Sequence, residues 1–533
     1  MPQDNTFVVP SGRGLNTAVR HRDAAPQECV DGANFDLNTD FAGFRRRKAF
    51  DLAGTATNAG QINGFAQLVT ASGTITTLVQ AGGTVYSWDG ASSFTSVGTV
   101  NSAARLRGPA HHIWKLNPEV VFITDLAKTE NLKTWDGTTF TDATEDLSGA
   151  LAAKYAMVYQ ERLFLANVTI GGTASPHLLL ASTRGANSTF DSSVRSLETS
   201  LLSSPFFLPV SDLAPINGLQ PGLRTLVMST ERGNLYQLIG RHAFEYELQE
   251  FYEGAGSSGN EALTNIGNDI LIGRAGHLDT LSGVERFGDT SVDNVDRWVH
   301  PNIEEVNEWT IIYDQRLQKV FCFPKDKSRL FVLHKSVLEL QDGGSPWSQW
   351  TTDHGVAFQP TAVMALRRPS DGRDVIYMGD ATGNIYQMDG DDGQDGGTTD
   401  IAAFRETGII EAEEDKVFDL SGYVDYKRLA SSTATLTFKH GGLNVFNQQA
   451  TVEIPASTEF AVYGDVAGND AYYNGSTAAS GDFYYGGRFQ DRISRSTFRV
   501  AGQSSFFRLR TEISGANEFE IDQIGINYQS TKD

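Results

Sequence analysis

The chain has 533 residues, 40% of them apolar, which is enough to bury sizeable cores and too many for one ordinary core, so two or more domains are expected. Its formal charge is −22 at pH 7, and residues 51–400 alone hold 24 Lys and Arg against 41 Asp and Glu. This balance argues against a general nucleic-acid binder, because contact with phosphates requires a basic surface.

Residues 1–50 are predicted to form an extended N-terminal arm and a docking segment. The arm is polar and holds Pro2, Pro10 and Pro26. A short strand over 34–37 and a turn then lead into the one dense basic run of the chain, Arg45, Arg46, Arg47 and Lys48. Two interpretations of this run stay open: a solvated strand end, which charged runs usually are, and an interface for an acidic partner surface. We predict the interface.

Residues 51–400 are predicted to form an irregular β-propeller. The stretch Asp374–Gly390 (DVIYMGDATGNIYQMDG) shows two alternating runs around a turn rich in Asp, Asn and Gly, which is typical of a hairpin. Similar hairpins recur at 79–98, 130–144, 226–240 and 269–283. Recurrent hairpins without a strict repeat favour an all-β toroid with five to eight blades. The acidic turn over 389–400 is predicted to be a solvated linker at the end of the propeller.

Residues 401–533 differ from the preceding region in the length of their alternating runs and are predicted to form a C-terminal β-sandwich. Longer runs of alternating apolar and polar residues appear here, ending in Phe519, Ile521, Ile524, Ile526 and Tyr528. Such runs suit two sheets that pack face to face, each with one apolar side. The whole chain is therefore predicted to be all-β.

Patterns that would indicate catalysis or cofactor binding are sparse, so we predict no catalytic residue, no cofactor and no metal. The two cysteines, Cys29 and Cys322, stand in no metal-ligand spacing. The Gly254–Gly259 stretch does not place a Ser between glycines as a nucleophile elbow does. His111 and His112 are adjacent, and on a strand their side chains would point to opposite faces. No phosphate-binding glycine loop opens a helix.

Two tryptophans occur in matching turns of sequence WDG, at Trp88 and Trp135, each followed closely by a Phe. Equivalent positions in successive hairpins indicate a repeated structural role, so packing inside a blade is preferred over a platform for sugars. No stretch approaches the about 20 apolar residues of a membrane-spanning helix, and no signal peptide is recognised. We therefore expect no membrane insertion.

The order of these parts resembles the tail nozzle or tail-hub (tail tubular) proteins of short-tailed bacteriophages. The resemblance rests on the N-F-D-L segment running into the basic cluster (Asn34–Lys48), the irregular hairpins, the segment Thr407–Lys427 that opens the sandwich and the closing pattern Phe506–Tyr528. It implies a non-enzymatic virion protein, made in the host cytoplasm and located in the virion tail. It also implies a homo-oligomer, a hexamer, that contacts the head-to-tail adaptor and other tail proteins while double-stranded DNA passes without specific binding.

Two other functions are alternatives to this one. A β-propeller hydrolase or lyase would act as a monomer or small assembly, with a central cleft. A glycan-binding module at the tail tip would expose the aromatic turns. Oligomeric state separates the first alternative from a tail ring, and burial of the tryptophans separates the second.

Overall fold

The computed structural model covers the whole chain, and its description here leaves out a set of short segments. These are residues 1–5, 10–12, 21–22, 27, 38–43, 57–59, 71, 113–119, 144–149, 161, 183–205, 223–224, 241–244, 268, 282–294, 326–328, 340–343, 352–359, 391–393, 415, 428–431, 441–445, 455–492, 515–519 and 531–533.

The chain divides into two compact units. The first, called the sandwich unit, comprises residues 1–51, 329–355 and 389–533; the second, the propeller unit, comprises 52–328 and 356–388. These limits differ from the predicted boundaries at 50 and 400. The first 51 residues share a unit with the C-terminal region, and residues 329–355 and 389–400, predicted to lie in the propeller, also belong to the sandwich unit. Among the described residues, no helix is long and apolar enough to cross a membrane.

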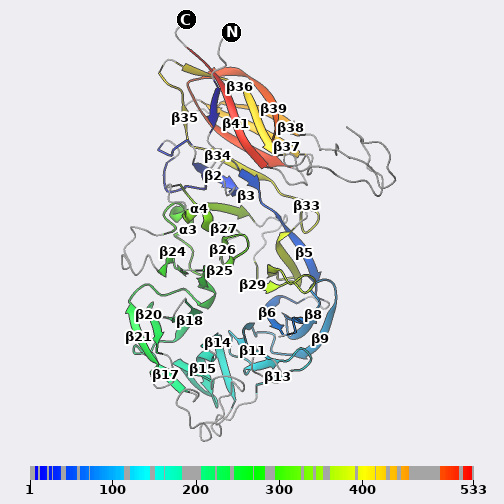
Figure 1. Cartoon of the computed structure of the whole chain (residues 1–533), viewed down its shortest axis with the longest axis vertical. Coiled ribbons are helices and arrows are strands. Elements are labelled where there is room, and N and C mark those ends of the chain that lie inside the picture. The colour runs from blue at the N-terminus through cyan, green and yellow to red at the C-terminus, as the bar shows by residue number, and fades with distance from the viewer. Residues whose placement is uncertain are drawn as a thin grey trace, which may run out of the picture. The chain divides into compact units, whose positions relative to one another are not determined.

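The sandwich unit contains two sheets of antiparallel strands (Figure 1). One has the order β3-β4-β41-β36-β39, with β1 also paired to β41. Its strands are β1 (Thr6–Val9), β3 (Phe35–Leu37), β4 (Phe44–Arg46), β36 (Lys416–Lys427), β39 (Ile493–Ser504) and β41 (Glu520–Ser530). The other has the order β2-β34-β40-β37-β38, with β35 paired to β40. Its strands are β2 (Cys29–Ala33), β34 (Ala403–Thr407), β35 (Ile410–Glu411), β37 (Ser432–His440), β38 (Phe446–Ile454) and β40 (Phe506–Ser514).

Aromatic side chains join the two sheets into the predicted sandwich. Phe418 of β36 meets Phe507 of β40 edge to face, with ring centroids 4.8 Å apart. Phe438 of β37 and Phe498 of β39 lie 5.6 Å apart. Such contacts between the inner faces are what holds a β-sandwich together.

The N-terminal strands are built into this sandwich. Strand β1 and the β3–β4 hairpin both pair with β41, near the C-terminus, and β2 pairs with β34. The sandwich unit also contains β27 (Arg329–His334), α4 (Lys335–Glu339), β28 (Trp347–Thr351) and the small hairpin β32 (Gln394–Asp395) and β33 (Thr399–Asp400). The two ends of the chain are thus tied to one another by backbone hydrogen bonds.

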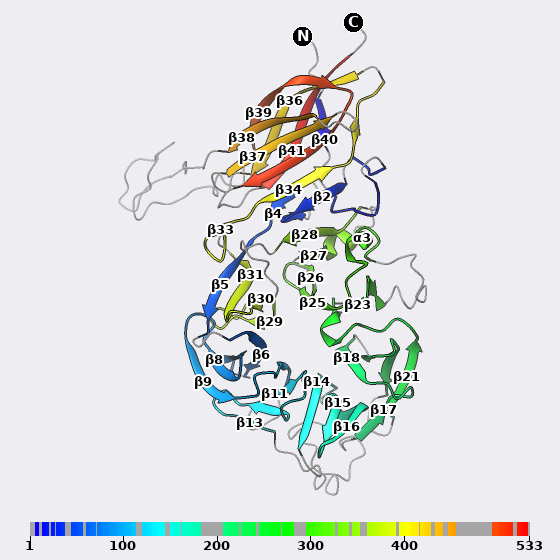
Figure 2. The ribbon, with the colours of Figure 1, turned by 180° about the vertical axis from the view of Figure 1, so that it is seen from behind.

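The propeller unit is a series of seven groups of consecutive antiparallel strands among the described residues (Figure 2). The first two groups are joined into one eight-stranded sheet by the parallel pairing of β10 with β6. The first group consists of β6 (Ile62–Val69), β7 (Ile75–Ala81), β8 (Thr84–Trp88) and β9 (Phe94–Thr99). The second consists of β10 (Leu106–His112), β11 (Val120–Asp125), β12 (Lys133–Trp135) and β13 (Phe140–Asp142). The third consists of β14 (Leu151–Tyr159), β15 (Arg162–Ile170), β16 (Thr173–Ala181) and β17 (Phe206–Pro209). The next three are β18 (Ile216–Pro221), β19 (Leu226–Thr230), β20 (Leu235–Ile239) and β21 (Glu247–Tyr252); β22 (Leu263–Asn265), β23 (Ile270–Arg274) and β24 (His277–Thr280); and β25 (Trp309–Asp314) with β26 (Lys319–Pro324). The seventh is β29 (Ala362–Arg367), β30 (Asp374–Gly379) and β31 (Asn384–Gly390), completed by β5 (Ala49–Thr55).

The first strands of these groups close into a ring. Each one contacts the first strand of the next group, in the order β6, β10, β14, β18, β22, β25 and β29, and β29 contacts β6 again. Strand β5, which precedes the first group in the chain, pairs with β31 of the last group. Strand β5 thereby closes the ring. The irregular propeller that the hairpin pattern predicted is confirmed, and its seven groups fall within the predicted range of five to eight blades.

The β30–β31 hairpin, predicted from the stretch Asp374–Gly390, has the hydrogen bonds and backbone conformation expected of its turn. One carboxylate oxygen of Asp380 accepts hydrogen bonds from the backbone N–H groups of Thr382 and Asn384, both at 2.8 Å. Gly383 adopts φ +93°, a left-handed conformation that glycine tolerates at no steric cost. The turn therefore sets the register of β30 and β31 locally.

Candidate functional site

The predicted interface residue Arg47 lies inside the sandwich unit. Its side chain is 1% exposed and pairs with the carboxylate of Asp395, to which its Nη1 donates at 2.8 Å. Its Nε donates to Asn34 Oδ1 at 2.9 Å, and its guanidinium lies 4.2 Å from the ring centroid of Phe50. The prediction of a solvated acidic linker is wrong for Asp395, which is also buried. One residue of the basic run and one of the acidic turn thus neutralise each other in the interior.

The other three residues of the run differ in exposure. Arg46 is buried, whereas Arg45 and Lys48 are partly exposed. Arg45 lies 3.5 Å from the buried carboxylate of Asp36. Only Arg45 and Lys48 can therefore offer part of their side chains to another molecule, and the predicted interface, as a proposal, rests on these two.

A Ser–His–Asp grouping occurs in the same unit, and its geometry is not that of a nucleophilic triad. Ser348 Oγ lies 2.9 Å from His334 Nε2, and Asp36 Oδ1 lies 3.5 Å from the same nitrogen. A triad needs the carboxylate on the opposite ring nitrogen, so that Nε2 is free to take the hydroxyl proton. All three residues are buried as well. The grouping is therefore a structural contact of the interior.

The tryptophans of the two WDG turns are packed inside their blades. Trp88 is 2% exposed and stacks on Phe94 of the neighbouring strand, with ring planes 15° apart. Trp135 is 1% exposed and stands opposite Phe140 in the β12–β13 ladder. The structural role predicted for both is confirmed.

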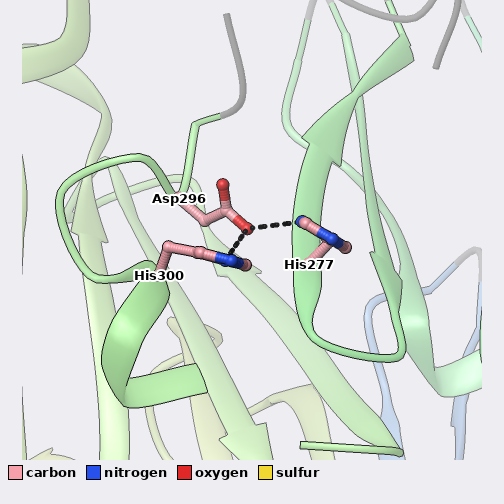
Figure 3. Close-up of side chains that lie close together, drawn as sticks. All are labelled: His277, Asp296 and His300. Carbon is pink, nitrogen blue, oxygen red and sulfur yellow. Dashed lines mark ion pairs between the residues drawn. The ribbon is translucent and has the colours of Figure 1, made fainter. Parts of the chain in front are cut away.

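A carboxylate and two imidazoles meet beside the three-stranded fifth group (Figure 3). Asp296 Oδ2 lies 3.4 Å from His277 Nδ1 and 3.7 Å from His300 Nδ1. The three nearest ligand atoms all lie within 4.8 Å of one another. The rings stack with centroids 4.8 Å apart and planes 16° apart. We call these residues the His-Asp-His cluster.

The local structure explains how these three residues come together. His277 opens β24, just after the turn at Gly276, while Asp296 and His300 are one helical turn apart where α3 (His300–Ile303) begins. The backbone N–H of Leu278 donates to Asp296 Oδ2 at 3.0 Å, which ties the two segments together. Burial raises the pKa of Asp296, against the effect of this hydrogen bond and of the two imidazoles.

Sequence reasoning predicted no metal and missed this cluster. The only local signal is the spacing of Asp296 and His300 in DRWVH, since residues four apart share one face of a helix. The third member, His277, comes from a separate hairpin. The histidines that were considered, His111 and His112, lie on β10 as consecutive strand residues, and their side chains fall outside the description.

A second charged cluster crosses the ring of the propeller. Glu261, in η1 (Asn260–Ala262) just before β22, pairs with Arg107 of β10, whose Nε donates to it at 2.8 Å. Lys325 Nζ lies 3.5 Å from the other carboxylate oxygen. Burial by itself would raise the pKa of Glu261, but Arg107 and Lys325 lower it to about 2. Strands β10 and β22 are not neighbours in the ring, so this pair links separated groups.

Comparisons with known proteins give no family. No known family model matches the chain, and no curated protein matches its sequence. Among solved structures, a catalytically inactive virginiamycin B lyase from Staphylococcus aureus in complex with quinupristin is similar at 10% identity and a TM-score of 0.35, covering 62% of this chain and 96% of that one. The WD40 domain of Toxoplasma gondii coronin (10%, TM-score 0.36, 67% and 87%) and YCF48 from Cyanidioschyzon merolae (9%, 0.36, 64% and 98%) are similar to a comparable degree. At these scores the likenesses carry no functional argument.

Proposed function

We propose that the protein is a structural virion protein, a tail nozzle or hub of a short-tailed bacteriophage, whose copies form a ring-shaped conduit for DNA ejection below the portal and adaptor. The observation that carries the proposal is the acidic charge of the propeller unit, together with a basic run whose central residues are buried. The propeller unit, residues 52–328 and 356–388, holds 22 Lys and Arg against 32 Asp and Glu, and Arg46 and Arg47 of the run are buried. Of the run Arg45–Lys48, only Arg45 and Lys48 are therefore partly exposed.

This charge distribution suits a wall along which DNA moves. A protein that neutralises phosphates releases counterions and gains affinity, so a basic wall would hold DNA in place. An acidic wall forms no such contacts, and like charge keeps the duplex away from it. Passage without specific binding is the behaviour proposed here.

The conduit would be formed between subunits. Within one propeller, the Arg107–Glu261 pair joins groups that are not neighbours in the ring. A hexamer of heterologous contacts that closes on itself supplies a separate axis. The partly exposed Arg45 and Lys48 are proposed to contribute to contacts with the neighbouring subunit or the adaptor.

The experiment that tests this function joins assembly with DNA binding. Native mass spectrometry of the purified protein, alone and with a portal–adaptor complex, is expected to show sixfold species. Fluorescence anisotropy with labelled duplex DNA at low salt is expected to show no saturable binding. Saturable, salt-sensitive DNA binding, or a protein that stays monomeric with and without its proposed partners, would contradict the proposal.

The alternatives gain no specific support from the geometry. A glycan-binding module would expose the aromatic turns, and Trp88 and Trp135 are buried. The Ser348–His334 contact does not support a hydrolase that uses a serine nucleophile, because it is buried and has its Asp36 partner on the wrong nitrogen.

A further inference from the structure

The His-Asp-His cluster has the donor set of a transition-metal site. Imidazole nitrogen and carboxylate oxygen together suit Zn²⁺ and its neighbours in the first transition row, and three protein ligands leave room for one water. We propose that His277, Asp296 and His300 bind one Zn²⁺ ion through His277 Nδ1, His300 Nδ1 and Asp296 Oδ2.

Two of the three distances among the ligand atoms are close to those around this ion, and the two histidine nitrogens lie within 4.8 Å of each other and would have to approach. With bonds of about 2.0 to 2.1 Å in tetrahedral geometry, neighbouring ligand atoms stand about 3.3 to 3.4 Å apart. The observed separations from Asp296 Oδ2 are 3.4 Å and 3.7 Å. The ligands need to move by only a few tenths of an ångström along these two edges.

Neither His277 Nδ1 nor His300 Nδ1 has a hydrogen-bond partner, although both atoms are buried. Buried polar atoms in folded proteins nearly always have a partner, and one without it calls for an explanation. Both nitrogens are turned toward the same carboxylate oxygen (Figure 3). An ion between the three atoms would satisfy all of them at once.

The imidazole rings have room for the small adjustment that coordination requires. They now stack within 16° of parallel, whereas a metal lies in the plane of each ring that binds it. The side chains of His277 and His300 are 34% and 41% exposed, so each can turn about its Cβ–Cγ bond. Asp296 is 1% exposed and is held by the Leu278 N–H, which makes it the fixed ligand of the three.

The backbone around the site is anchored independently of any ion. Gly276 N donates to Val306 O at 2.7 Å, and Val299 N donates to Asp296 O at 2.8 Å. Val299 and Ile303 are fully buried. The ligands therefore stand on two segments that already meet, which is the arrangement that keeps a metal site preorganised.

A bound ion would connect two segments beside the fifth group of the propeller. This group has three described strands, where the first four groups have four each, and β24 is its last strand in the sheet order. The ion would clamp the segment that carries Asp296 and His300 against the first residue of β24. It thus strengthens the attachment of α3 to this group.

Metal binding to the full chain tests the proposal directly. The protein is stripped with a chelator, and Co²⁺ is titrated while its visible absorption is recorded; Zn²⁺ affinity follows from competition. We expect one ion per chain with the intense absorption of a four-coordinate site. His277→Asn and His300→Asn should each weaken binding by at least about 100-fold, the upper end of the loss seen for outer-shell partners. The matched control, His177→Asn in β16, should bind as the wild type does.

A second measurement uses only the wild-type chain and so does not depend on the folding of a variant. Histidine modification followed by mass spectrometry should show that Zn²⁺ protects His277 and His300 while His177 stays reactive. Absence of binding by the wild type, binding by the two site variants as tight as that of the wild type, or no protection of His277 and His300 would each overturn the proposal.

Discussion

Each unit contains an ion pair between residues far apart in the sequence, and the two pairs differ in how deeply they are buried. In the sandwich unit, the side chains of Arg47 and Asp395 are 1% and 2% exposed, and further hydrogen bonds satisfy the guanidinium. In the propeller unit, the side chains of Arg107 and Glu261 are 13% and 16% exposed. Loss of one partner leaves an uncompensated charge in either case, and the free-energy cost grows with burial. From this comparison we expect the burial of a pair, more than the separation of its residues in the sequence, to decide how much free energy of unfolding is lost when one partner is removed.

The largest expected effect is on the sandwich pair. Arg47→Ala strands the Asp395 carboxylate among buried atoms, so the free energy of unfolding of the sandwich unit should fall by about 3–5 kcal/mol. Hydrogen–deuterium exchange of peptides from the sandwich strands measures it, since buried tryptophans lie in both units and their fluorescence would report on both. The control, Glu413→Gln in an exposed pair with Lys416, should change stability by less than about 1 kcal/mol. Equal effects of the two variants would break the comparison.

A double substitution sharpens the same point. If most of the loss in Arg47→Ala comes from the stranded carboxylate, adding Asp395→Ala should recover part of it. The expected coupling in a double-mutant cycle is about 1–3 kcal/mol. Strictly additive losses would show that the two side chains stabilise the unit independently.

The propeller pair should have a smaller effect that depends on pH. Glu261→Gln is expected to lower the free energy of unfolding by about 2 kcal/mol at pH 7, because Arg107 and Lys325 lose a charged acceptor. The pKa of this carboxyl is about 2 in the folded chain, below its ordinary value of 4.5. Its contribution is therefore complete above about pH 4.5 and disappears as the pH falls toward 2. The free energies of unfolding of the wild type and of Glu261→Gln should therefore converge as the pH falls toward 2. A difference that stays constant with pH would contradict this prediction.

The smallest expected effect on stability belongs to the partly exposed end of the basic run. Lys48→Glu should change the stability of the isolated chain by less than about 1 kcal/mol, as surface charge changes usually do. If Lys48 contributes to the proposed subunit junction, the same change should reduce the sixfold species in native mass spectra. Replacing all four residues of the run together would confuse these effects, because Arg46 and Arg47 are buried. Unchanged assembly of Lys48→Glu would remove this residue from the junction.

Local patterns predicted the hairpins, the buried tryptophans and the sandwich strands, because turn residues and alternation act over a few positions. The pairing of Arg47 with Asp395 joins residues 348 apart in sequence, and no local pattern indicates it. Both were expected at the surface, since runs of like charge usually lie there. The His-Asp-His cluster was missed for the same reason, because His277 reaches Asp296 only once β24 and α3 have packed.

The central claim is that copies of an acidic propeller protein surround a hollow axis. Electron microscopy of the purified protein bound to a portal–adaptor complex tests it most directly. The account predicts a sixfold ring with an axial hole whose wall is lined mainly by acidic residues. A lone subunit on the adaptor, or a ring whose bore is lined by Lys and Arg, would contradict it.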